Sequence, residues 1–102
     1  MRIHVLKIWP SFFQEMIDGK KPFEVRKNDR DFRVGDVLKL LAYDPDLGYV
    51  DGWVRGNGIN VEPAPGSNGR RGVDFAWFDV TYILGPQLSP PGFVVMAVKL
   101  RA

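Results

Sequence analysis

The feature that most constrains the fold of this chain is a series of short apolar segments with a period of two. Alternation of apolar and polar residues is typical of a strand with one buried face. The pattern predicts strands at 2–8, 23–28, 37–43, 49–55, 75–84 and 93–100. Glycine, proline, asparagine and aspartate dominate the segments between them, which is turn chemistry. About six short strands joined by such turns favour a small β-barrel or half-barrel.

One segment has the period of a helix instead. Its apolar stripe consists of Phe12, Phe13, Met16 and Ile17, at the spacing of a short helix from about Pro10 to Asp18. Proline suits the first turn, where a helix needs no N–H, and Gly19 stands where a left-handed C-terminal cap is expected. The fold class we predict is therefore mixed α+β, mainly β, with one main N-terminal helix.

The alternation also predicts which side chains face the core. Both faces of 2–8 are rich in apolar residues, so this strand is expected to be covered on both sides. Phe23 and Val25 are expected in the core, with Glu24, Arg26 and Asn28 on the opposite face. The expected inner faces of the last two strands are Ala76, Phe78, Val80, Tyr82 and Leu84, and then Val94, Met96, Val98 and Leu100.

Length and composition limit the class of protein. A chain of 102 residues is predicted to form one domain over 1–102, and 45% apolar with 13% aromatic residues suffices for a core. The absence of cysteine excludes a disulfide framework and any thiolate ligand or nucleophile. His4 is the one histidine, expected in the core, so a Ser–His triad or a histidine-rich metal site is not expected. We predict no metal and no cofactor.

The apolar runs are too short to span a bilayer, and residues 1–8 alternate charged and apolar types, unlike a signal peptide. We therefore expect a cytoplasmic monomer with no membrane partner. The segment 56–72 has five glycines, two prolines and three asparagines among seventeen residues. It is predicted to be a long flexible loop, either mobile or a functional flap.

Positive charge is concentrated in one short segment. Residues 20–33 contain six Lys/Arg and three Asp/Glu, whereas the rest of the chain has eight and nine. Mixed charge at this density can recognise a polar, anionic ligand by paired hydrogen bonds. The alternative interpretation is a solvated charged face.

Within that segment, Glu24 and Arg26 are two apart on a strand and share a face. A guanidinium and a carboxylate side by side can read a base edge, or can form an internal ion pair with no ligand. Lys20 and Lys21 follow the helix and can contact phosphates, compensate the helix dipole, or, with a depressed pKa, supply a base or nucleophile.

The candidate ligand-binding residues are Lys20, Lys21, Glu24, Arg26, Lys27, Asn28, Arg30 and Trp9. Asn28 and its neighbours to Asp31 also suit a plain turn, with Asp29 or Asp31 as a second carboxylate if the site is catalytic. Phe32 and Tyr82 are further candidates for stacking on a base, whereas Trp53 and Trp77 are predicted to be packing residues.

The order of these features resembles the ASCH domain of the PUA-like superfamily. The resemblance rests on Gly19-Lys20-Lys21-Pro22-Phe23-Glu24-Val25-Arg26, followed by Val34-Gly35-Asp36-Val37-Leu38. The continuation from Arg26 to Phe32, a Leu6-Lys7-x-Trp9-Pro10 stretch and the strand 80–84 are similar to a small uncharacterised branch found in phage and bacterial genomes. The resemblance covers most of the chain except 56–72.

The resemblance implies a PUA-like pseudobarrel that binds RNA or modified bases. Some ASCH proteins act as ribonucleases, and others remove an acyl group from cytidine with a Lys after the helix, a Thr three residues later and a distant Glu. Lys21 matches that Lys, whereas Glu24 stands at the position of the Thr and the distant Glu has no clear match.

We therefore predict that the chain binds RNA or a modified nucleotide in a cleft beside the first helix. The first alternative is a small metal-independent hydrolase, a ribonuclease or an acylated-nucleoside amidohydrolase, with Lys21 and Glu24 as catalytic residues. The second is a phage accessory protein that binds a host protein through the charged segment.

Overall fold

The computed structural model describes residues 1–101. Its elements are β1 (Ile3–Ile8), α1 (Pro10–Ile17), β2 (Phe23–Lys27), β3 (Val37–Asp44), β4 (Gly48–Tyr49), β5 (Asn60–Pro63), β6 (Gly72–Ile83), a 3₁₀ turn (Pro86–Leu88) and β7 (Phe93–Leu100). The strands form one sheet in the order β1-β3-β6-β7-β2, with β4 paired to β3 and β5 to β6. β1 and β3 run parallel, and the other pairs are antiparallel.

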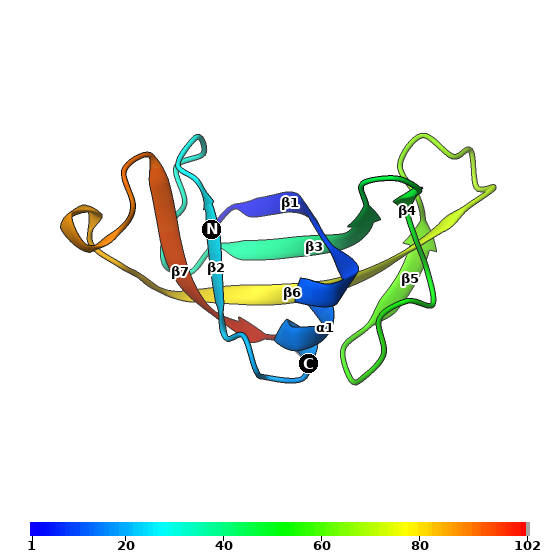
Figure 1. Ribbon diagram of the computed structural model, residues 1–102, viewed down its shortest axis with the longest axis horizontal. Coiled ribbons are helices and arrows are strands. Elements are labelled where there is room, and N and C mark those ends of the chain that lie inside the picture. The colour runs from blue at the N-terminus through cyan, green and yellow to red at the C-terminus, as the bar shows by residue number, and fades with distance from the viewer. Residues whose placement is uncertain (102) are drawn as a thin grey trace.

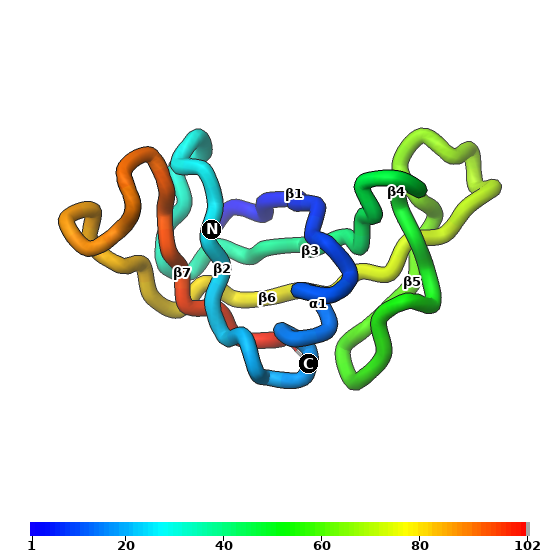
Figure 2. The backbone as a smooth tube through the Cα atoms, viewed as in Figure 1, coloured from blue at the N-terminus to red at the C-terminus, as the bar shows by residue number. Residues whose placement is uncertain are grey.

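The sheet curls into a half-barrel whose two outermost strands are β1 and β2 (Figure 1). α1 lies in front of the sheet in the direction of view of Figures 1 and 2, and its Phe13 and Met16 join the core that also contains Leu40, Phe78 and Met96. The helix bounds are close to those predicted, and Gly19 has the expected left-handed φ of 77°. The predicted mainly β, mixed α+β barrel-like fold is thus confirmed.

The two edge strands correct the predicted burial. β1 is covered on one side only: His4, Leu6 and Ile8 are buried, whereas Ile3 and Val5 are 54% and 49% exposed. The prediction that both faces of this strand are covered was wrong, because β1 is an edge strand that pairs with β3 alone and keeps its outer face in solvent.

β2 has its faces reversed relative to the prediction. Phe23 and Val25 are 42% and 41% exposed, whereas Glu24 is only 4% exposed. β2 pairs only with β7, and its inner face carries an ion-paired network in place of apolar side chains. The alternation separated the two faces correctly, but the more apolar face is the outer one.

Two further segments differ from the prediction. Of the strand expected at 49–55, only Tyr49 belongs to a strand, because the N–H groups of residues 52–54 bind the buried carboxylate of Asp74. The loop expected at 56–72 contains β5, which forms a hairpin with β6. The flexibility of this segment stays a prediction.

The end of β6 also departs from simple alternation. A β-bulge lies between Val80 and Tyr82, so Tyr82 turns outward and is 60% exposed, contrary to the prediction that it shares the inner face. β7 has the predicted bounds, with Val94, Met96 and Val98 buried. No helix within residues 1–101 has the length and apolar character that a membrane span requires.

Candidate functional site

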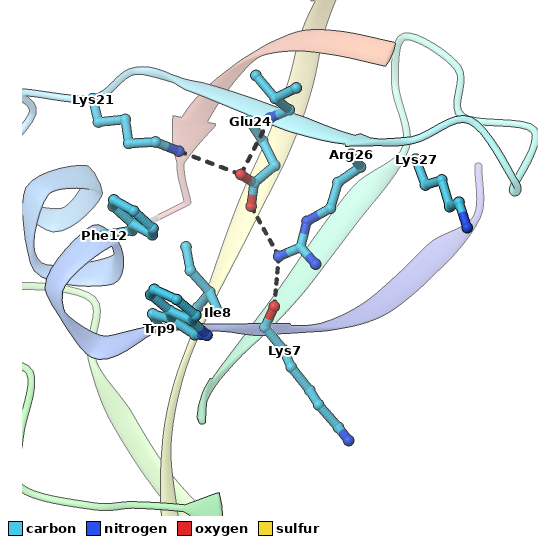
Figure 3. A pocket seen from close by; sticks show the side chains of 9 residues that line it. Lys7, Ile8, Trp9, Phe12, Lys21, Glu24, Arg26 and Lys27 are labelled. Atoms are coloured by element: carbon cyan, nitrogen blue, oxygen red, sulfur yellow. Dashed lines mark hydrogen bonds and ion pairs between the residues drawn. The ribbon is translucent and has the colours of Figure 1, made fainter. Parts of the chain in front are cut away.

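A cleft of about 400 Å³ lies between β2 on one side and the junction of β1 with α1 on the other. We call it the helix cleft. It is lined by Lys7, Ile8, Trp9, Phe12, Lys21, Glu24, Val25, Arg26 and Lys27 (Figure 3). Trp9 directly precedes α1, and Phe12 lies three residues further on, so both aromatic side chains reach one wall of the cleft. The charged face of β2 forms the opposite wall.

The buried carboxylate of Glu24 organises that charged wall. Its Oε1 accepts hydrogen bonds from Lys21 Nζ at 3.3 Å and from the N–H of Val25 at 3.2 Å, and its Oε2 accepts one from Arg26 Nη2 at 3.1 Å. The Lys21 and Arg26 side chains are 18% and 25% exposed. Burying a carboxylate is unfavourable unless it is paired and hydrogen-bonded, and these three donors meet that requirement.

Two arginines bridge the gap between the sheet's two edge strands. Arg26 Nη2 donates to the carbonyl of Lys7 at 2.6 Å (Figure 3), and Arg30 Nη1 donates to the carbonyl of Val5 at 3.2 Å. Both carbonyls belong to β1. Hydrogen bonds from guanidinium groups, rather than backbone hydrogen bonds between strands, therefore join the two open edges of the sheet here. A second hollow of about 180 Å³, which we call the seam hollow, lies along this bridge and shares Arg26 and Lys27 with the helix cleft.

Arg26 keeps hydrogen-bonding capacity after these contacts. Within residues 1–101, its side-chain hydrogen bonds all leave from Nη2. A guanidinium has five N–H donors, so Nε and Nη1 are available as separate donors on opposite edges of the group while Nη2 holds it in place. These donors are thus oriented before any ligand arrives.

The aromatic wall is exposed and ordered. Trp9 and Phe12 are 54% and 45% exposed, and their rings stack with centroids 5.8 Å apart and an angle of 5° between the planes. Lys21 Nζ lies 5.9 Å from the centroid of Phe12. Parallel aromatic rings beside oriented cations offer a flat apolar surface next to hydrogen-bond donors, which suits a planar polar ligand.

The geometry gives little support for a catalytic role of the candidate residues. Lys21 Nζ donates to the carbonyl of Phe23 at 3.0 Å and to Glu24, whereas a nucleophilic amine needs a free lone pair. Asp29 lines the seam hollow, and Asp31 pairs with Arg33 outside the helix cleft. No cluster of three His, Asp or Glu side chains that would suit a metal ion occurs within the part of the chain described.

The other predicted residues lie around the cleft. Lys20 is exposed and outside the helix cleft, Arg30 lines the seam hollow, and Asn28 lines a separate hollow on the far side of the turn. Phe32, a candidate for stacking, is buried against the ring of His4 at 4.6 Å and is therefore a core residue. Tyr82, the other candidate, is exposed but lies outside the cleft.

Four lining residues were not among the predicted site residues: Lys7, Ile8, Phe12 and Val25. Phe12 was assigned to the apolar stripe of the helix, yet it faces the cleft. Adjacent positions on a helix point about 100° apart, so Phe12 can face the cleft while Phe13 faces the core, and the spacing of Trp9 from Phe12 was the available signal. Lys7 contributes its backbone carbonyl to the cleft, and no sequence pattern predicts a backbone contribution of this kind.

A second buried polar pair lies at the opposite end of β1. His4 Nε2 lies 2.9 Å from Asp36 Oδ2, and the Asp36 carboxylate also accepts the N–H groups of Arg2 and Arg33 at 3.0 Å. Burial opposes ionisation of Asp36, but the hydrogen bonds from His4 and from the two N–H groups outweigh it and lower the pKa of Asp36. This pair fixes the turn before β3, and the prediction of His4 as a core residue is confirmed.

The chain was compared with known proteins. No curated protein matches it. The sequence model of one family, described as a domain of unknown function, DUF3850, matches residues 3–98. Since this match covers nearly the whole chain, the protein belongs to the DUF3850 family.

Proposed function

We propose that the protein binds RNA or a modified nucleotide in the helix cleft. The observation that carries this proposal is the Arg26 guanidinium, which is held through Nη2 by Glu24 and by the Lys7 carbonyl and keeps its Nε and Nη1 donors. Each of these oriented donors can give a charge-assisted hydrogen bond to an acceptor on a nucleobase or to a phosphate oxygen. A volume of about 400 Å³ lies within the range of small-ligand sites.

The base would stack on the wall formed by Trp9 and Phe12, because aromatic rings bind the π-face of any base. Glu24 has less capacity than its position in the sequence suggested, since Oε1 already accepts two hydrogen bonds. Its principal role in the proposed site is to orient Lys21 and Arg26. Lys21 and Lys27 are placed to contact phosphate oxygens.

The resemblance to the ASCH domain points to the same ligand class and stays a prediction. A hydrolase that uses Lys21 and Glu24, and an accessory protein that binds a host protein, also stay predictions, since no contact in the cleft favours either. The proposal includes a cytoplasmic monomer that needs neither metal nor cofactor.

The experiment is a binding titration with two probes: the four ribonucleoside 5′-monophosphates, read by thermal shift, and a fluorescein-labelled RNA octanucleotide, read by anisotropy. Arg26→Lys keeps the charge but loses the planar guanidinium and its oriented donors, and Lys21→Ala removes a donor. Each is expected to weaken binding about tenfold, the effect of one charge-assisted hydrogen bond.

Matched controls come from the same segment. Lys20→Ala and Arg33→Ala each remove one exposed cation outside the helix cleft and should change affinity less than about twofold. Thermal melts establish that each variant is folded. The proposal is wrong if the native protein binds neither probe, or if the two cleft variants bind as tightly as the two controls.

A further inference from the structure

The helix cleft continues into two more hollows toward the other end of the molecule. The tryptophan hollow, about 360 Å³, lies between Trp9 and Trp53 and also touches the turn at 44–45. The arginine hollow, about 370 Å³, lies between Trp53 and the pair Arg70 and Arg71. Trp9 is a wall of both the helix cleft and the tryptophan hollow, and Trp53 is a wall of both new hollows. With the seam hollow, four hollows thus adjoin in a row.

Trp53 lines both the tryptophan hollow and the arginine hollow, and hydrogen bonds to its loop hold it in an exposed position. It was predicted to be a packing residue, yet it is 50% exposed. Its loop is held from below by Asp74, which accepts the N–H groups of residues 52–54 at 2.9–3.0 Å. Gln14 of α1 holds the same loop through two hydrogen bonds to the backbone of Arg55, at 2.8 and 2.9 Å. A firmly anchored loop that displays a tryptophan to solvent is typical of a binding surface.

The far end supplies cations. Arg71 Nη2 donates to the carbonyls of Leu47 and Tyr49 at 3.1 and 2.9 Å, which again leaves the separate Nε and Nη1 donors of an oriented guanidinium. Arg70 beside it is exposed and makes no side-chain hydrogen bond within residues 1–101. Lys7 Nζ lies over the ring of Tyr43, 4.4 Å from its centroid, and 5.7 Å from that of Tyr49, so a cation also lies between the helix cleft and the arginine hollow.

The row of hollows carries the same excess of three positive charges as the segment 20–33, but from residues that lie far apart in the sequence. Seven basic and four acidic residues line the four hollows, whereas the rest of the chain keeps seven basic and eight acidic residues. The four acids are Glu24, Asp29, Asp44 and Asp51. The first is paired with cations, and the Asp44 carboxylate accepts the N–H groups of Asp46 and Leu47 at 2.9 Å. The available charge along the row is therefore mainly positive.

We propose that the four hollows form one track for a single strand of nucleic acid several nucleotides long, and that Trp53, Arg70 and Arg71 form its second half. This inference rests on the proposed function, because it extends the same site. Alternation of exposed aromatic rings with cations is the arrangement that binds single strands, with bases stacked on the rings and phosphates near the cations. A duplex does not fit this scheme, since its bases are already stacked.

The test compares a dinucleotide with an octanucleotide, each as RNA and as DNA, by anisotropy. Trp53→Ala is expected to weaken octanucleotide binding about tenfold, the cost of one lost stacked base, and to leave dinucleotide binding in the helix cleft within about twofold. Arg70→Ala should lower the slope of log affinity against log salt by about 0.7, the value for one phosphate contact on a single strand. Comparison of the affinities for the RNA and DNA probes shows which of the two the protein prefers.

Tyr82→Ala and Arg55→Ala are the controls, because both side chains are exposed and neither lines the four hollows. Both should leave octanucleotide binding unchanged. The track is wrong if Trp53→Ala and Arg70→Ala bind the octanucleotide like the native protein, or if a duplex of the same length binds equally well. In either case, dinucleotide binding that depends on Arg26 would leave the proposed function standing. If the native protein binds neither the dinucleotide nor the octanucleotide, the proposed function itself is contradicted.

Discussion

Glu24 and Asp74 are two buried carboxylates with the same number of hydrogen bonds and different donors. Glu24 is 4% exposed and Asp74 1% exposed, and each accepts three hydrogen bonds. The donors to Asp74 are all backbone N–H groups of the loop after β4. Two of the three donors to Glu24 are the side chains of Lys21 and Arg26, which line the helix cleft.

The different donors suit the two hydrogen-bond networks to different roles. Backbone donors cannot leave Asp74 without unfolding the loop that they belong to, so this network stabilises one conformation. The cations bound to Glu24 are partly exposed and have donors to spare, so they can contact a ligand while they remain paired. Asp74 therefore serves the fold and the position of Trp53, whereas Glu24 serves the cleft.

Removing Asp74 should give the largest effect. Asp74→Ala leaves three N–H groups of the loop without a buried acceptor, each worth about 1–3 kcal/mol when unsatisfied. We expect the free energy of unfolding, measured by urea titration, to fall by about 3 kcal/mol or more. Asp46→Ala, at an exposed turn position, should change it by less than about 0.5 kcal/mol. Equal stability of the two variants would show that the Asp74 network does not hold the loop.

Glu24→Gln should separate positioning from stability. The amide keeps the shape of the side chain but loses the charge that pairs with Lys21 and Arg26, so the free energy of unfolding should fall by only about 1 kcal/mol. Binding of a nucleoside monophosphate in the helix cleft should weaken about tenfold, because the Arg26 guanidinium loses one of its two anchors. A large loss of stability with unchanged affinity would mean that Glu24 is a purely structural residue like Asp74.

The same pair of residues indicates how far the sequence alone could lead. Alternation identified most strands, and the helical period and Gly19 identified the helix and its cap, because local sequence patterns decide these elements. It grouped Glu24 with Arg26 correctly but placed Phe23 and Val25 in the core, since alternation separates two faces without saying which one turns inward. On an edge strand of a curled sheet, tertiary contacts decide that question, and here an ion-paired network lies inside.

The far half of the molecule was harder to predict for a related reason. The carboxylate of Asp74 replaces the strand ladder expected for residues 49–55, and this contact joins residues about twenty positions apart. Trp53 was assigned to the core because tryptophan in an apolar segment is usually buried. Its exposure depends on that long-range carboxylate contact, which no local pattern reports.

Asp36 combines both kinds of donor and should give the smallest effect, which is confined to acid pH. Its pKa in the folded protein lies below the ordinary value of 3.8, because the hydrogen bonds from His4 and from the N–H groups of Arg2 and Arg33 outweigh the effect of burial. A carboxyl group with a lowered folded pKa stabilises the fold above its unfolded pKa, and this contribution disappears as the pH falls through the folded pKa.

The difference in free energy of unfolding between the native protein and Asp36→Asn should therefore shrink progressively as the pH falls below about 5, in the range where carboxyl groups titrate. Urea titrations at a series of pH values measure it. Asp46→Asn, at an exposed carboxylate, should show no such change. A difference that grows on acidification would mean that the folded state binds the Asp36 proton more tightly than the unfolded state does, opposite to the effect expected from its three hydrogen-bond donors.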